Sequence, residues 1–148
     1  MDIFSDLFNG VTSLMSGLWP QLQEKPGLIN GKLRSCPGTP NCVSSESCTP
    51  AEKVDPLKFI GSSADAWLRL KAVIIESGGV IEEEQQEYIW STFTVPVFGF
   101  VDDVEFRLDR TENIIHVRSA SRLGISDLGV NRSRVDQLRE AFGKAGKN

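Results

Sequence analysis

The sequence is poor in the residues that most often build metal or catalytic centres. It has one histidine, His116, and three cysteines, Cys36, Cys42 and Cys48, which follow a C-x5-C-x5-C spacing. No CxxC pair is present, and this spacing matches no common zinc site. We therefore expect neither a metal nor a cofactor, and we assign no catalytic residue from the sequence.

Long hydrophobic runs and an excess of positive charge are also missing. No stretch approaches the 18 consecutive apolar residues that indicate a membrane-spanning helix. The 16 basic and 20 acidic residues give a net charge of −4, so the chain offers no overall field for nucleic acid. With 148 residues, 40% hydrophobic and 24% charged, the chain has the length and composition of one globular domain.

The N-terminal segment, residues 1–19, is expected to be retained, because Asp2 and Asp6 stand where a secretion signal carries basic residues. Its apolar residues recur at helical spacing and predict an amphipathic helix that ends at Pro20. This helix either docks on the domain or on a second copy, or lies on a membrane surface. Membrane contact would use Ile3, Phe4, Leu7, Phe8, Leu14, Leu18 and Trp19. Its acidic residues favour docking. We expect a cytoplasmic location, peripheral at a membrane in the second case.

Six of the seven prolines lie between residues 20 and 56, which predicts an extended, turn-rich arm. Regular structure is expected from about residue 57, so the predicted units are residues 1–19, 20–56 and 57–148. A disulfide between Cys36 and Cys42 is conceivable across the turn from Pro37 to Pro40. Without an export signal, however, we expect reduced thiols.

The remaining chain alternates between helical and strand patterns. Ser62 and Ser63 predict a helix start, followed by an apolar stripe that ends at Gly78. A second helix is predicted over residues 131–142, with Asn131 as its N-cap. Four strands are predicted at residues 80–83, 88–96, 101–109 and 114–120. This order predicts an α+β two-layer sandwich, a mainly antiparallel sheet of four to five strands with helices on one face.

The hairpin over residues 101–120 predicts its own register. If residues 110–113 form the loop, Asp109 pairs with Ile114, and antiparallel counting sets Leu108, Arg107, Phe106 and Glu105 opposite Ile115, His116, Val117 and Arg118. The apolar pairs then share the core face. Asp103, Glu105, Arg107, His116 and Arg118 share the opposite face.

Arg132 and Arg134 stand in the first turn of the last predicted helix, where positive charge is unfavourable by about 0.3–1 kcal/mol each. An anionic ligand would compensate for it. The predicted binding residues are Arg118, Arg122, Arg132, Arg134, Asp102, Asp103, Ser121, Asp127 and Asn131. The alternative is an internal network in which Asp102, Asp103, Glu105 and Asp127 pair with the four arginines.

An enzyme is harder to build from these residues. His116 is expected to be exposed on the sheet beside Arg107, whose charge disfavours a protonated ring. A cysteine–histidine pair would require the arm to fold across that face. Asp103 and Glu105 are close enough for acid–base chemistry, but we expect the flanking arginines to lower the pKa of both carboxyls.

Four motifs resemble a known family. They are residues 36–45 (CPGTPNCVSS), 98–106 (FGFVDDVEF), 116–122 (HVRSASR) and 126–132 (SDLGVNR). Together they are similar to the bacterial and plastid-lineage family called domain of unknown function 1499, over about residues 36–138. The resemblance implies that the arm around Cys36 and Cys42 belongs to the domain. Many relatives carry an N-terminal membrane segment or export signal, whereas this chain has only the amphipathic segment, which strengthens the membrane-peripheral alternative.

The sequence thus predicts a non-enzymatic binding module that recognises an anionic small molecule or a protein partner through an Arg/Asp-rich sheet face. Nucleic acid is not an expected partner. Two alternatives remain open at this point. The first is a structural adaptor at a membrane, and the second is an enzyme that uses His116 with a carboxylate or a thiol.

Overall fold

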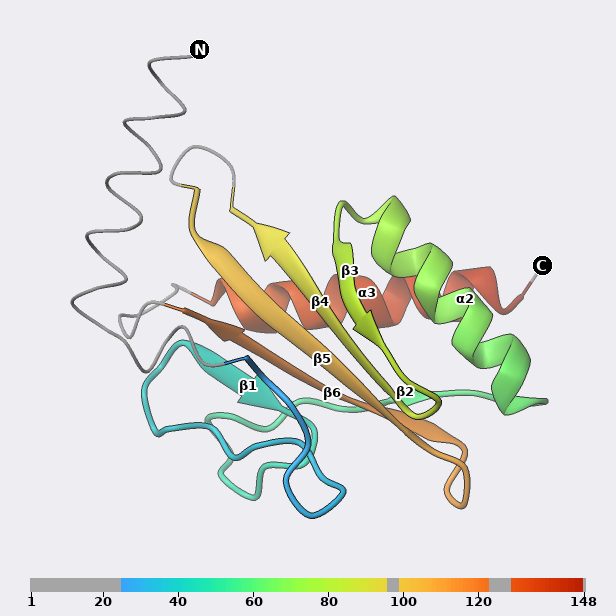
Figure 1. Cartoon of the computed structure of the whole chain (residues 1–148), viewed down its shortest axis with the longest axis horizontal. Helices are drawn as coiled ribbons and strands as arrows, with labels where there is room; N and C mark the ends of the chain where they lie inside the picture. The colour runs from blue at the N-terminus through green and yellow to red at the C-terminus, as the bar shows by residue number, and fades with distance from the viewer. Residues whose placement is uncertain (1–24, 96–98, 123–128, 148) are drawn as a thin grey trace, which may run out of the picture.

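The four strands predicted between residues 80 and 120 form most of one antiparallel sheet (Figure 1). The structure, a computed structural model, describes residues 25–95, 99–122 and 129–147. The predicted strands are β3 (Val80–Glu84), β4 (Tyr88–Thr94), β5 (Val101–Asp109) and β6 (Ile114–Ser121). Each begins at the predicted residue, because β-branched and aromatic residues are concentrated between short turns.

Two further strands pair with the outer edge of β6, so the sheet has six strands instead of four to five. These are β1 (Cys42–Ser44) and β2 (Leu57–Lys58), and they pair antiparallel with opposite ends of β6. The strand order is β1-β6-β5-β4-β3, with β2 beside β6. Both added strands are too short for their sequence to show an alternating pattern. They are strands only because they pair with β6. The fold is α+β, as predicted, and the proline-rich arm contributes to the sheet.

Helix α2 (Ser63–Glu76) begins and ends where the sequence predicts. The Ser62 hydroxyl accepts a hydrogen bond from the Asp65 amide at 3.0 Å and caps the helix. At the other end Gly78 adopts φ +94°, a left-handed conformation that glycine tolerates.

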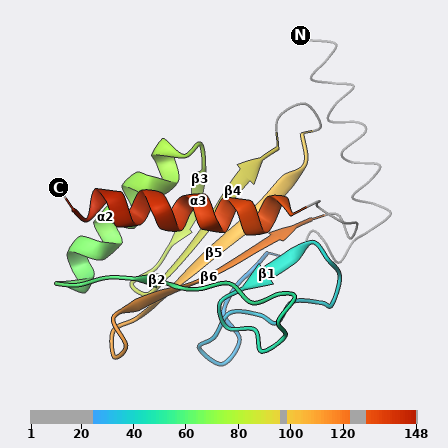
Figure 2. The same cartoon turned by 180° about the vertical axis from the view of Figure 1, so that it is seen from behind.

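Helix α3 (Val130–Ala145) lies across one face of the sheet (Figure 2). Its apolar face, formed by Val135, Leu138 and Phe142, is buried in the same core as the apolar side chains of α2 and of the sheet. The Arg69 guanidinium of α2 stacks over the Phe142 ring at 4.2 Å and joins the two helices. The hydrophobic core therefore lies between the sheet and the helices.

Strand β3 is one edge of the sheet, with no second neighbour among the described residues. Its pairing with β4 shifts between Ile81 and Glu83, which is a β-bulge. Glu82, Glu83 and Glu84 follow one another along this strand. Three carboxylates therefore border this edge.

Candidate functional site: the polar face of the sheet

The hairpin of β5 and β6 has the predicted register, including Arg107 opposite His116 and Glu105 opposite Arg118. Strand β4 adds Tyr88 opposite Arg107 and Trp90 opposite Glu105. Opposite residues of an antiparallel pair share a face. We call the sheet face opposite α3 the polar face. It carries Tyr88, Trp90, Asp103, Glu105, Arg107, His116 and Arg118, with Arg122 at its end.

The proline-rich arm covers the end of the polar face at Arg107. The Glu46 carboxylate accepts hydrogen bonds from the Arg107 guanidinium and, at 2.7 Å, from the Leu33 amide. The Ser45 hydroxyl oxygen lies 2.9 Å from His116 Nδ1. His116 is consequently half-buried and not exposed as predicted. Its pKa is lowered chiefly by this burial, and only to a smaller extent by Arg107.

Glu105 lies at the centre of the polar face and is fully buried. The Tyr88 hydroxyl donates a hydrogen bond to it at 2.7 Å, and Arg118 Nη1 donates at 3.3 Å. The expectation that arginines lower the pKa of this carboxyl is wrong. Burial raises the pKa of Glu105, because lost hydration outweighs the Tyr88 hydrogen bond and the Arg118 charge. Burial also raises the pKa of Tyr88. Both groups therefore hold their protons more tightly than in water.

At the opposite end of the polar face, which we call the open end, the described part of the arm leaves Arg122 partly exposed. Arg122 Nε and Nη2 each donate to one Asp103 oxygen at 3.1 Å. Trp90 Nε1 donates to the same carboxylate at 2.9 Å and fixes its orientation. The Arg122 side chain is 40% exposed, whereas that of Asp103 is 14% exposed. Arg122 is therefore held in one orientation with part of its guanidinium facing solvent.

The structure divides eight of the nine predicted binding residues between two faces of the sheet. Arg118, Arg122 and Asp103 lie on the polar face. Asp102 alternates to the other face, where it is buried and ion-paired with Arg134 of α3. Arg132 anchors α3 to the arm, because its Nη1 and Nη2 donate to backbone carbonyls at 2.9 and 2.8 Å. The predicted residue Asp127 lies outside the described residues.

Asn131 is not the N-cap of α3, contrary to the prediction. The cap is Gly129, at φ +82° and with no side-chain cap hydrogen bond. Asn131 is fully buried in the first turn, where it accepts from the Ser119 hydroxyl. It donates to the Ser121 hydroxyl at 2.8 Å and to the Asn41 carbonyl at 3.1 Å. Its side chain therefore ties together α3, β6 and the arm.

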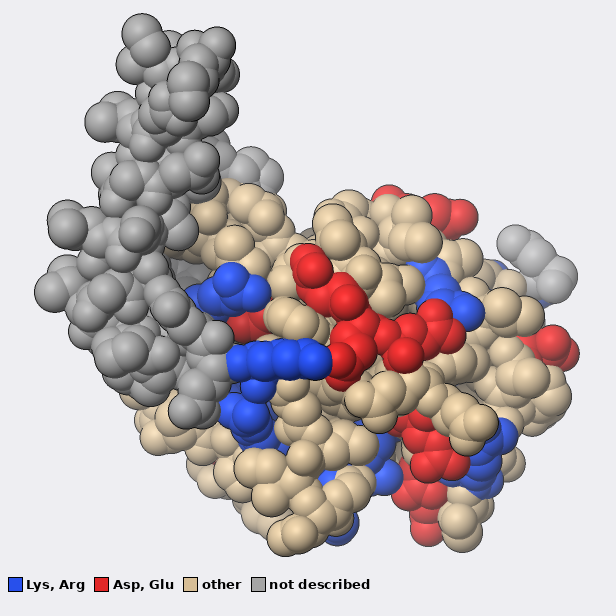
Figure 3. All heavy atoms as spheres, in the orientation of Figure 1, with Lys and Arg blue, Asp and Glu red and all other residues tan. Residues whose placement is uncertain are grey.

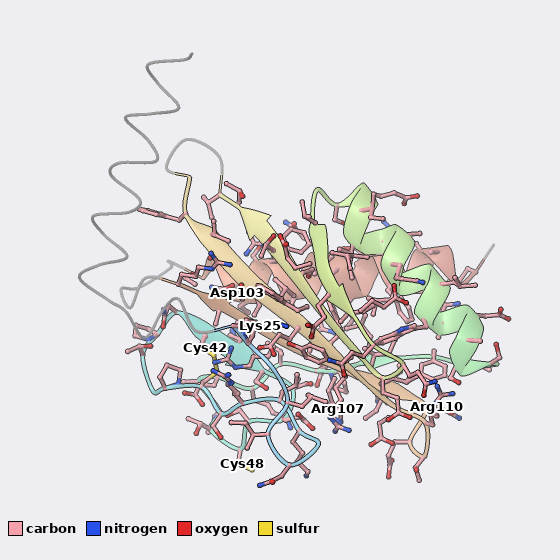
Figure 4. The ribbon with its side chains drawn as sticks, viewed as in Figure 1. Lys25, Cys42, Cys48, Asp103, Arg107 and Arg110 are labelled. Carbon is pink, nitrogen blue, oxygen red and sulfur yellow. A yellow bond between two sulfur atoms is a disulfide. The ribbon has the colours of Figure 1, made fainter. Side chains whose placement is uncertain are left out.

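Charges of both signs alternate near the open end. Lys25 of the arm forms an ion pair with Glu83 of β3. Glu83 lies opposite Trp90 of β4 in the sheet. Figure 3 shows Lys and Arg side chains gathered directly beside Asp and Glu side chains on this side of the molecule. Figure 4 shows Asp103 and Lys25 toward one end of this face and Arg107 toward the other. The open end thus presents positive groups held by carboxylates.

The structure joins Cys36 and Cys42 by a disulfide and leaves Cys48 as an exposed free thiol. This pairing is the one considered from the sequence, but it differs from the expectation of reduced thiols. The turn between the two cysteines includes Gly38 at φ +92°, a conformation that lets the chain reverse tightly. Neither Cys36 nor Cys42 is therefore a free thiol for His116.

Sequence reasoning missed Tyr88, Trp90, Ser45 and Glu46. The alternation of β4 was a usable signal for Tyr88 and Trp90, because residues two apart on a strand share a face. Ser45 and Glu46 gave no comparable signal. Their role depends on where the arm crosses the sheet, which the local sequence of the arm does not specify.

The described contacts of the polar face are hydrogen bonds and ion pairs. The hydrogen bonds of Glu105 go to Tyr88 and Arg118, and the His116 ring contacts the Ser45 hydroxyl, which is itself buried. In the described part of the chain, no group of three or more His, Cys, Asp or Glu residues is placed to hold a metal ion. No helix within those residues has the length and apolar character needed to cross a membrane.

Comparison with known proteins identifies a family but no relative of established activity. No curated protein and no solved structure matches the chain. The family model described as "Protein of unknown function (DUF1499)" matches residues 32–142. This range includes the arm from Lys32, the whole sheet and most of α3, and it confirms the resemblance seen in the sequence motifs. The chain therefore belongs to the DUF1499 family.

Proposed function

We propose that the domain is a binding module that recognises an anionic group, carried by a small molecule or a protein partner, at the open end of its polar face. Arg122 is the residue that binds the ligand directly. Asp103 and Trp90 orient it, and Lys25 extends the positive surface on the arm side. The proposal narrows the predicted site to the polar face, since Arg132 and Arg134 are engaged by backbone carbonyls and by Asp102.

The observation that carries the proposal is the geometry of Arg122. A guanidinium has five N–H donors, and two of them are directed to Asp103. Among the described residues, the other three have no hydrogen-bond partner. A carboxylate or phosphate can accept from the free end of the guanidinium without displacing Asp103. Because Arg122 is already ordered, binding costs little side-chain entropy.

The same geometry limits the affinity for a free anion. Two charge-assisted hydrogen bonds contribute about 1.5–3 kcal/mol each, and Asp103 offsets part of the positive charge. We therefore expect a dissociation constant of about 1 mM for inorganic phosphate. A protein partner that carries an acidic group would bind more tightly, because it also contacts the surrounding face.

Inorganic phosphate titrated into the full chain tests the proposal, with the Trp90 indole N–H followed by NMR. This group donates to Asp103 and reports directly on the Asp103–Arg122 pair. We expect its resonance to shift on phosphate addition and the shift to be lost in Arg122→Gln. Arg110→Gln is the matched control, because Arg110 also forms an exposed ion pair, with Glu87, at the far end of the hairpin.

An unchanged Trp90 resonance in the wild-type chain, or equal binding by Arg122→Gln, would overturn the proposal. Arg122→Lys separates charge from geometry, because lysine keeps the charge but lacks the planar fork. We expect this variant to bind phosphate less well than the wild type.

The location of the protein is a separate proposal. The sequence favours the cytoplasm, where thiols are kept reduced, whereas a Cys36–Cys42 disulfide favours an oxidising compartment. The mass of the protein isolated from its host under alkylating conditions distinguishes the two. A reduced pair supports the cytoplasm, and an intact disulfide contradicts it.

A further inference from the structure

The disulfide lies beside β6, the strand that Arg122 immediately follows. Cys42 pairs with Ala120 in the β1–β6 ladder. The preceding residue, Asn41, accepts a hydrogen bond from the Ser121 amide at 3.0 Å and donates from its side chain to the Ser121 carbonyl at 3.0 Å. Ser121 immediately precedes Arg122. The position of Arg122 is therefore tied through Ser121 and Asn41 to the disulfide-closed turn.

Described contacts reach the turn at its last residue, Asn41. The residues between the two cysteines are Pro37, Gly38, Thr39, Pro40 and Asn41. The Thr39 hydroxyl donates to the Asn41 side chain, and Asn131 donates to the Asn41 carbonyl. These contacts hold Asn41 itself, whereas the disulfide closes the turn that leads into it. Without the covalent bond, the turn gains conformational freedom and the Asn41 hydrogen bonds to Ser121 weaken.

A second set of bonds limits the size of the effect. On the inner side of β6, Ser121 pairs with Asp102 of β5, and the Arg122 amide donates to the Val101 carbonyl at 3.2 Å. These contacts do not involve the arm. Loss of the disulfide should therefore reduce the fraction of molecules in which Arg122 is correctly held, without unfolding the sheet.

The two sulfur atoms of the disulfide differ in their exposure to solvent. Cys42 is only 3% exposed, whereas Cys36 lies in the partly exposed part of the turn. A dithiol reductant can attack the Cys36 sulfur through its thiolate, and the Cys42 sulfur then leaves as a thiolate and takes up a proton. The second thiol of the reductant displaces Cys36 and closes the disulfide of the reductant. Two electrons and two protons pass to the protein.

We propose that the Cys36–Cys42 disulfide is a redox control of the Arg122 site, so that reduction by a dithiol weakens anion binding. This inference rests on the proposed function. The oxidised turn holds Asn41 and hence the end of β6 in the binding geometry. Reduction releases the turn and lowers the population of the binding-competent arrangement.

The test compares inorganic phosphate binding to the oxidised and the reduced full chain, both in the Cys48→Ser background, which prevents exchange with the exposed third thiol. Dithiothreitol is the reductant because it is uncharged and does not compete for Arg122. We expect the dissociation constant to rise about threefold on reduction, as for a site that is competent in about one third of the molecules. The Ser121 amide should lose hydrogen-exchange protection in parallel.

A second variant separates reduction from side effects of the reagent. Cys36→Ser in the same background removes the disulfide while it keeps the buried Cys42 side chain in place. It should bind phosphate like the reduced chain, with or without dithiothreitol. The amides of Val104 and Phe106 in the core serve as the folding control, and their protection should not change.

The outcomes separate the two proposals. Equal phosphate affinity in the oxidised and reduced chains, with the Trp90 response intact, overturns the redox control but leaves the proposed function standing. No phosphate response in either state overturns both. Loss of core protection in Cys36→Ser would show that the disulfide supports the whole fold, and it would also overturn a control specific to the Arg122 site.

Discussion

At the residue scale, Glu105 shows how burial can reverse an expectation based on neighbouring charges. The sequence correctly places it opposite Arg118, and that neighbour alone would stabilise its carboxylate. Predicting the opposite pKa direction required knowing that the side chain is fully buried. That burial results from the packing of the whole polar face, which no local pattern specifies. Charge proximity was predictable here, but the hydration of the site was not.

Removing the Glu105 carboxyl should destabilise the domain strongly. Glu105→Ala leaves the Tyr88 hydroxyl and the Arg118 guanidinium without this acceptor in a buried site. We expect the free energy of unfolding, measured with urea, to fall by about 3–5 kcal/mol. Glu105→Gln keeps an oxygen for Tyr88 and should cost less. Equal costs for the two variants would contradict a specific role of the hydrogen bond.

Glu105 should also make stability depend on pH. Its folded pKa lies above the ordinary value of 4.5, so the folded chain binds this proton more tightly than the unfolded chain. Its contribution to stability is therefore complete below pH 4.5 and is lost as the pH rises through the folded pKa. We expect Glu105→Gln to lose this decline in urea titrations at several pH values. The lowered pKa of His116 acts in the opposite direction and is present in both chains. Parallel pH profiles would refute the assignment.

At the element scale, the strands were predictable where side chains alternate strictly. The β5–β6 register follows from matching apolar and charged positions, and a shift of one residue would have put Phe106 against His116. The N-terminus of α3 was not predictable in the same way. Asn131 has the chemistry of an N-cap, but tertiary contacts bury its side chain among Ser119, Ser121 and Asn41. Gly129 then takes the cap position.

Gly129, the N-cap of α3, and Gly143, within the helix, should respond to alanine with opposite signs. Gly129→Ala forces a β-carbon into a left-handed conformation, although its β-carbon would meet no atom within 4 Å. The cost should therefore be backbone strain alone, about 1–2 kcal/mol. Gly143→Ala lies within the helix and also meets nothing within 4 Å, so it should stabilise by about 0.5–1 kcal/mol. Thermal unfolding of both variants checks this, and a neutral Gly129→Ala would contradict the strain argument.

At the scale of the whole molecule, the arm was the least predictable part. Its prolines correctly indicate an extended segment, and the family resemblance correctly assigns it to the domain. Its path over the polar face depends on contacts between residues far apart in the chain, such as Glu46 with Arg107. For the same reason, the sequence grouped nine residues into one site, whereas the sheet separates Asp102 and Asp103 onto opposite faces. Adjacent positions on a strand always diverge in this way.

Glu46 should hold the arm as a unit. Its carboxylate joins Arg107 on the sheet to the Leu33 amide in the arm, and both side chains of the ion pair are largely buried. We expect Glu46→Ala to lower the free energy of unfolding by about 2–3 kcal/mol. Hydrogen exchange should accelerate in the arm before it does in α2 or α3. Glu87→Ala, which removes an exposed ion pair with Arg110, is the control and should cost less than about 1 kcal/mol. Uniform acceleration over the chain would contradict an arm that opens separately.

The acidic edge strand β3 also affects the tendency of the protein to aggregate at high concentration. An unpaired strand edge is a template for sheet growth from one molecule to the next. Here the bulge at Ile81 and Glu83 interrupts the edge. A second copy would bring its own acidic strand against Glu82, while Glu83 and Glu84 are ion-paired with Lys25 and Lys71. That repulsion is screened over about 3 Å at 1 M salt, compared with about 10 Å at 0.1 M. Concentrated protein solutions should therefore remain clear at low ionic strength, and added salt should promote aggregation.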